Sequence, residues 1–206
     1  MITAFLTGFF IGLSLIVAIG AQNSFVLRQG ILKQHVFYVA LFCAISDALL
    51  IGIGISGTSF LFDKFTDQIL NYLLGFSALW LIVYGSLKFK AAFSGSSLID
   101  INESTPKNLI STLSILSIFT FANPHVYLDT MVLIGSVSQQ YHDEDKIIFG
   151  LGASLASFVF FFTLSYGARL LAPMMYRPYS WRILDSLIGL IMFTIAIKLA
   201  FTANWI

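Results

Sequence analysis

The stretch AIGAQNSFVLRQG, residues 18–30, follows an apolar segment without charged side chains and raises the question of how its polar residues are accommodated. Gln22 and Asn23 come directly after that segment, although a helix in lipid has to satisfy every polar group internally. Irregular backbone at membrane depth is tolerated where it lines protein or water. We therefore interpret the stretch as an unwound segment lining a polar pathway; the alternative is that the helix ends at Gly20 and an interfacial loop follows.

The composition places the chain among polytopic membrane proteins. Of 206 residues, 58% are hydrophobic and only 10% are charged, against roughly 25% charged in soluble domains. A net charge of +1 argues against nucleic acid as a partner. The single cysteine, Cys43, excludes an internal disulfide and argues against a thiolate metal site. No cleaved signal peptide and no cofactor are expected, and no P-loop, HExxH or GxSxG motif indicates an enzyme.

Six segments are long and apolar enough to cross a bilayer, which takes about 20 residues. We predict an all-α bundle with transmembrane helices at roughly 2–28, 36–62, 69–88, 110–138, 147–171 and 183–203. The polar stretch 89–108 separates a first unit, residues 1–88, from a second unit, residues 109–206. A homo-oligomer is compatible with this organisation.

Basic residues predict the orientation of the bundle. Eight lie in or beside the first, third and fifth connections, and three lie on the other side. By the positive-inside rule the richer side is cytoplasmic, so 89–108 is a cytoplasmic linker and both termini face outward. The eight are Arg28, Lys33, Lys88, Lys90, Lys107, Arg169, Arg177 and Arg182, and the three are Lys64, Lys146 and Lys198.

An odd number of spans in each unit implies that a second copy of the unit inserts upside down. GAQN in the first unit corresponds to FANPH, 121–125, in the second, and Asn23 corresponds to Asn123. Residues 46–57 correspond to 156–167, with Asp47 opposite Ser157. Chance could supply any one of these matches. Together they predict an inverted repeat, which is typical of transporters with broken helices at the binding site.

Two acids in predicted spans are the strongest site candidates. An ionised Asp at the bilayer centre costs about 2.5–3.5 kcal/mol on insertion scales, so Asp47 and Asp129 should face protein or a water-filled cavity. Asp129 follows Asn123 and Pro124, and proline disfavours helix at the residue before it. We expect a break there that exposes helix amides able to hold a carboxylate. The alternatives are a structural Asp47, and a plain kink with Asp129 at the outer interface.

Other residues carry weaker signals. Gly8 and Gly12 have the spacing of close helix packing. His125 lies four residues before Asp129 and could bond to it, although a lone histidine is more often structural. For Asp185, pairing with Arg182 is the simpler expectation.

The segments GAQNSFVLRQGI, SDALLIGIGISG and FANPHVYLDTMVLIGS resemble the LysE family of basic amino acid exporters, close to its lysine/arginine branch. The resemblance covers nearly the whole chain, and NPHVYLDT is its most specific part. It implies an exporter of L-arginine or L-lysine in the bacterial inner membrane, with motif positions at Gln22, Asn23, Asp47, Asn123, Pro124 and Asp129. Related branches export neutral amino acids or divalent metal, so the fold alone does not name a substrate.

The residues and the resemblance lead to one main hypothesis and two others. The main one is a secondary transporter that exports a basic amino acid in exchange for entering protons, with two aspartates for the cationic groups and helix amides for the carboxylate. The second is a divalent-cation exporter, which would need more ligands than Asp47, Asp129 and Cys43. The third is a membrane scaffold or enzyme subunit without transport.

Overall fold

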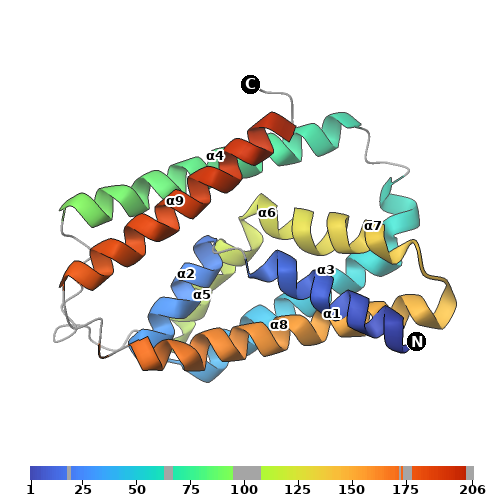
Figure 1. Cartoon of the computed structure of the whole chain (residues 1–206), viewed down its shortest axis with the longest axis horizontal. Helices are drawn as coiled ribbons and strands as arrows, with labels where there is room; N and C mark the ends of the chain where they lie inside the picture. The colour runs from blue at the N-terminus through green and yellow to red at the C-terminus, as the bar shows by residue number, and fades with distance from the viewer. Residues whose placement is uncertain (18–19, 63–66, 95–107, 172, 174–177, 203–206) are drawn as a thin grey trace.

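A computed structural model describes residues 1–17, 20–62, 67–94, 108–171, 173 and 178–202. Within these ranges all regular elements are helices (Figure 1), which confirms the all-α class. Four helices are straight, long and apolar enough to span a bilayer: α3 (Val36–Phe62), α4 (Asp67–Ser94), α8 (Asp143–Leu171) and α9 (Pro178–Thr202). They confirm the spans predicted at 36–62, 69–88, 147–171 and 183–203.

The two other predicted spans are bent pairs of helices. Helices α1 (Ile2–Ile16) and α2 (Ala21–Ile31) meet at 84°, and α5 (Leu109–Phe121) meets the segment Pro124–Ser138 at 62°. That segment consists of α6 (Pro124–Tyr127), the π-helix η1 (Leu128–Leu133) and α7 (Ile134–Ser138). The described residues therefore provide four spans, or up to six if each bent pair crosses the membrane once.

The first bend corrects the interpretation of residues 18–30. Gln22 and Asn23 lie in the first turn of α2, so they are helical and not unwound. The interfacial loop after Gly20 is also wrong, because α2 continues to Ile31. The interruption falls between Ile16 and Ala21, and residues 18–19 lie outside the described ranges.

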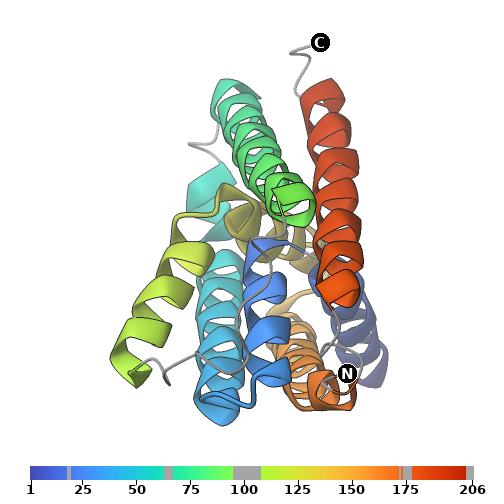
Figure 2. The ribbon, with the colours of Figure 1, turned by 90° about the vertical axis from the view of Figure 1, so that its left-hand side faces the viewer.

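Helices α4 and α9 form one side of the molecule and run antiparallel, next to each other in both views (Figures 1 and 2). A glycine of each helix packs against a phenylalanine ring of the other helix. A Cβ at Gly85 would lie 3.2 Å from the ring of Phe193, and one at Gly189 would lie 3.0 Å from the ring of Phe89. An ion pair of 3.1 Å joins Lys88 to Asp185 across the same interface. The expected pairing of Asp185 with Arg182 is therefore wrong.

Helices α1, α3 and α8 form a second group of packed helices. In this group α8 contacts α1 and α3, and it also contacts α2. A Cβ at Gly8 would overlap the carbonyl oxygen of Phe149, and one at Gly12 would lie 3.0 Å from Cα of Ala153. The close helix packing predicted for these two glycines is confirmed, with α8 as the partner.

A third close approach joins α3 to the π-helix. A Cβ at Gly54 would lie 2.7 Å from Cα of Met131 and 2.9 Å from its carbonyl oxygen. Asp47 lies two turns earlier on α3, and Asp129 lies on η1. The absence of a side chain at Gly54 thus lets the two acid-bearing helices pack together.

The predicted linker lies largely outside the described residues, which leave out 95–107. On its two sides, Phe89–Ser94 continues α4, and Asn108 caps α5 by accepting a hydrogen bond from the amide of Ile110 at 3.3 Å.

Candidate functional site

The break in the second bent pair follows from Asn123 and Pro124. Asn123 has an extended backbone, φ −92° and ψ 108°, as steric conflict with a following proline favours. Its side-chain oxygen accepts a hydrogen bond from the amide of His125 at 3.1 Å and so caps α6. The Tyr127 hydroxyl donates to the carbonyl oxygen of Phe121 at 2.8 Å, which satisfies an acceptor at the end of α5. The predicted break at Asn123-Pro124 is confirmed.

The break in the first bent pair is held by Asn23. Its Nδ2 donates to the carbonyl oxygen of Ile16, the last residue of α1, at 2.8 Å. The amide of Ser24 donates to the carbonyl oxygen of Gly20 at 3.0 Å and closes the first turn of α2. Asn23 therefore satisfies the helix that ends, whereas Asn123 caps the helix that begins.

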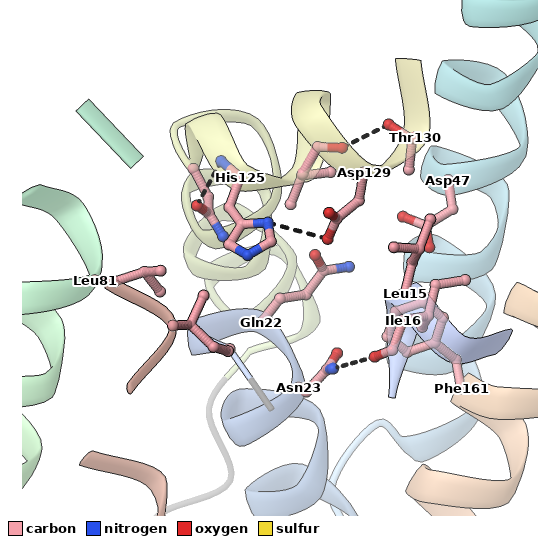
Figure 3. Close-up of a pocket in the computed structure, with 14 residues that line it drawn as sticks. Leu15, Ile16, Gln22, Asn23, Asp47, Leu81, His125, Asp129, Thr130 and Phe161 are labelled. Carbon is pink, nitrogen blue, oxygen red and sulfur yellow. Dashed lines mark hydrogen bonds and ion pairs between the residues drawn. The ribbon is translucent and has the colours of Figure 1, made fainter. Parts of the chain in front are cut away.

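A cavity of about 60 Å³ lies where the two breaks meet α3 (Figure 3). One buried water molecule needs about 10–15 Å³ of cavity volume, so this cavity has room for a few water molecules. Its lining combines polar groups from the breaks with apolar groups from α4, α8 and α9: Leu15, Ile16, Gly20, Gln22, Asn23, Asp47, Leu81, Asn123, His125, Val126, Asp129, Thr130, Phe161 and Ile195.

Both predicted aspartates line this cavity, each with a different partner. Asp47 is 3% exposed and accepts a hydrogen bond from the Ser157 hydroxyl of α8 at 3.1 Å. Oδ2 of Asp129, on η1, lies 3.0 Å from Nδ1 of His125, four residues earlier in α6. Neither carboxylate is paired with a lysine or arginine in the described part of the chain. The cavity therefore contains two carboxyl groups, of which one is paired with an imidazole and the other with a hydroxyl.

Gln22 is the polar lining residue with an unused donor. Its side chain extends from the first turn of α2 toward Asp129 (Figure 3), and the residue is 6% exposed. The Nε2 group forms no hydrogen bond in the structure. It faces the thiol of Cys43, and a thiol sulfur is only a weak acceptor.

The structure thus brings five of the six predicted site residues to one cavity: Gln22, Asn23, Asp47, Asn123 and Asp129. Pro124 is not part of the lining and contributes through the break. Sequence reasoning gave His125 too little weight, although its spacing of four residues from Asp129 was the available signal. Leu81, Phe161 and Ile195 come from distant helices, and nothing local in the sequence indicates them.

Groups of three or more His, Cys, Asp or Glu side chains placed to hold a metal ion do not occur within the described ranges. The cavity has two carboxylates and one imidazole, and the remaining polar groups of its lining are amides and one hydroxyl.

Comparison with known proteins identifies the family. Residues 13–203 match the LysE type translocator family. The chain belongs to the LysE family. A protein of Mycobacterium bovis named as a putative amino-acid transporter is 39% identical to this chain over 191 residues. The match covers 93% of this chain and 94% of the relative. Arginine exporter protein ArgO of Pectobacterium atrosepticum is 36% identical, covering 97% of this chain and 98% of the relative. ArgO of Photorhabdus laumondii is 37% identical, covering 97% and 96%.

Membership of the LysE family has two consequences. The protein is a membrane translocator, and it is not an enzyme, as the sequence predicted. The family resemblance derived from three short segments is confirmed, because the match extends over most of the chain. No solved structure matches this chain.

Proposed function

We propose that this LysE family member exports a basic amino acid, L-arginine or L-lysine, across the bacterial inner membrane by alternating access. The observation that carries the proposal is the position of Asp47 and Asp129 on one cavity, where neither carboxyl group is paired with a lysine or arginine among the described residues. Arginine and lysine each bring two cationic groups, and two carboxylates offset the cost of removing these from water. The names of the two ArgO relatives favour arginine.

The size of the cavity favours alternating access. Sites for small molecules usually enclose about 300–1,000 Å³, whereas this cavity has about 60 Å³. The bundle must therefore open on one side to admit an amino acid. The two bends between short helices offer places where such a rearrangement can occur without breaking a continuous helix.

Proton entry would make export of a cation feasible. Moving one positive charge outward against 100 mV costs about 2.3 kcal/mol, and an entering proton cancels that electrical cost. His125 and Asp129 are the groups we propose for proton exchange. A protonated imidazole at 3.0 Å would compete with the substrate cation for the same carboxylate. Asp47 is the other acidic side chain of the cavity, and α4 and α9 contribute only the apolar side chains of Leu81 and Ile195 to the lining.

The proposal includes an inverted repeat of two units, residues 1–88 and 109–206, with both termini outside. Each unit has a bent pair followed by two straight helices, which supports equivalence of α3 with α8 and of α4 with α9. Asp47 and Ser157, opposite each other in the predicted repeat, form a hydrogen bond. The reciprocal Gly–Phe contacts of α4 and α9 have the same internal symmetry.

Neutral amino acids and divalent cations are the competing substrates. A neutral amino acid would leave one carboxylate without a cationic partner. For a divalent ion, the described ranges contain no group of three or more His, Cys, Asp or Glu side chains placed to hold it.

The test is export from liposomes that contain the purified protein. Labelled arginine, lysine, threonine and cadmium are loaded separately, and efflux is measured with and without an inward proton gradient. We expect efflux of arginine or lysine, accelerated by the gradient. Efflux of threonine or cadmium alone would contradict the proposal, and basic amino acid efflux insensitive to the gradient would contradict its proton coupling.

A further inference from the structure

The beginning of α2 opens onto the cavity without a capping side chain. Gly20 precedes the helix with an extended backbone and lines the cavity. The first amides of an α-helix have no acceptor within the helix. A polar side chain usually caps them, and glycine cannot. This eleven-residue helix therefore presents the positive end of its dipole to the cavity.

Gln22 provides a second, independent indication of a ligand at this place. Its Nε2 group is buried, lines the cavity and makes no hydrogen bond. A buried donor without an acceptor costs free energy, so such groups usually have a partner that completes them. An acceptor bound at the α2 end of the cavity would satisfy it.

At the other break, the start of the helix already has a side-chain cap. The side chain of Asn123 already caps α6, and Pro124 has no amide hydrogen. This differs from our expectation that the break at Asn123-Pro124 would hold a carboxylate. The uncapped helix start at the cavity is that of α2, whereas Asp47 and Asp129 lie on α3 and η1.

We propose that the N-terminus of α2 and Gln22 form a subsite for the α-carboxylate of the transported amino acid, with the cationic groups directed to Asp47 and Asp129. This proposal rests on the proposed function in taking an amino acid as cargo. The subsite distinguishes an amino acid from the corresponding amine. A carboxylate gains a charge-assisted hydrogen bond from Gln22 and a favourable interaction with the helix dipole, and an amine gains neither.

The experiment compares arginine with agmatine, the amine formed when arginine loses its carboxyl group, in the liposome assay. The wild type should export arginine with a KM at least about tenfold lower than that of agmatine. Gln22→Met preserves the shape and removes the donor. It should raise the KM of arginine about 10- to 100-fold, as expected for a lost hydrogen bond to a charged group, and leave the KM of agmatine unchanged. Gln22→Glu should repel the carboxylate and favour agmatine over arginine.

Gln29→Met is the matched control, because Gln29 is also buried on α2 and its Oε1 has no hydrogen-bond partner, yet it does not line the cavity. It should leave the ratio of the two KM values at the wild-type level. If Gln22→Met fails to reach the membrane, the proposal is tested by the ratio of the KM values for arginine and agmatine in the wild type and in Gln22→Glu.

The possible failures are distinguishable. Equal KM values for arginine and agmatine in the wild type, or a parallel rise of both in Gln22→Met, would overturn the subsite and leave basic amino acid export intact. Export of threonine without arginine would overturn the proposed substrate. The subsite would then be tested in the same way with threonine and 1-amino-2-propanol, its decarboxylated counterpart. Export of cadmium alone would overturn both.

Discussion

The two helix breaks contain the same residue type at corresponding places but use it in opposite directions. At the first break, Asn23 donates backward to Ile16 and satisfies the end of α1, while the start of α2 has no side-chain cap. At the second, Asn123 caps α6 and Tyr127 satisfies the end of α5. One break therefore leaves the start of a helix without a side-chain cap, and the other provides side-chain partners on both sides. This difference is the reason that the proposed carboxylate subsite lies at the first break.

The largest expected effect tests whether the cavity between the breaks is the transport site. Asp47→Asn and Asp129→Asn should each reduce export by at least about 30-fold, because losing one partner of a buried charge pair costs about 2–5 kcal/mol, and each 1.36 kcal/mol is about tenfold in rate. Export rates normalised to folded protein in liposomes measure this. Glu144→Gln, at an exposed residue of α8, is the control. Lower protein levels with normal transport per molecule would instead show a structural role.

The next effect tests what fixes the position of α2 after the first break. A Cβ at Gly30 would overlap the carbonyl oxygen of Ser165, whereas one at Gly20 would meet nothing within 4 Å. Gly30→Ala should destabilise the protein by about 1–3 kcal/mol through overpacking, and Gly20→Ala should have little effect. Thermal unfolding in detergent compares the two. Equal loss in both variants would mean that the backbone at Gly20, and not the contact of α2 with α8, limits stability.

A smaller effect separates the two asparagines. Serine is as good an N-cap as asparagine, so Asn123→Ser should keep the cap on α6 and change stability by less than about 0.5 kcal/mol. Asn23→Ser cannot span the distance to Ile16 and should cost about 1–3 kcal/mol, because a buried carbonyl loses its donor. Unfolding midpoints of both variants provide the measurement. A larger loss of stability in Asn123→Ser than in Asn23→Ser would contradict the roles given to the two asparagines.

The smallest effect concerns His125 beside the second break. His125→Gln retains a polar side chain but removes the group that can change its charge near neutral pH. Export should fall only a few-fold at its optimum and should lose most of its dependence on pH between about 6 and 8. Initial export rates over that range measure the change. A pH profile identical to that of the wild type would exclude His125 from proton exchange.

Features that depend on neighbouring residues could be predicted from the amino-acid sequence alone. Hydropathy located the four straight helices, since about 20 apolar residues suffice to span a bilayer wherever they occur. Pro124 determined the second break, because its missing amide hydrogen and its conflict with Asn123 act locally. The spacing of Gly8 and Gly12 indicated close packing, because small residues four positions apart lie on one face of a helix. Asp47 and Asp129 could be chosen because a charge in an apolar segment is costly at any position.

Contacts between groups that are distant in the sequence follow from the packing of the helices. Asp185 bonds to Lys88, which lies 97 positions away in the sequence, and not to Arg182 within its own helix. Ser157 reaches Asp47 from α8, and Leu81 and Ile195 close the cavity from α4 and α9. The sequence also placed the first break at Gln22 and Asn23, where α2 is in fact regular. No local rule could correct this, because the interruption depends on a side chain that reaches back seven residues and on the packing of α2 against α8. Contacts between helices depend on how complete surfaces fit together, and the order of residues along one segment does not specify that fit.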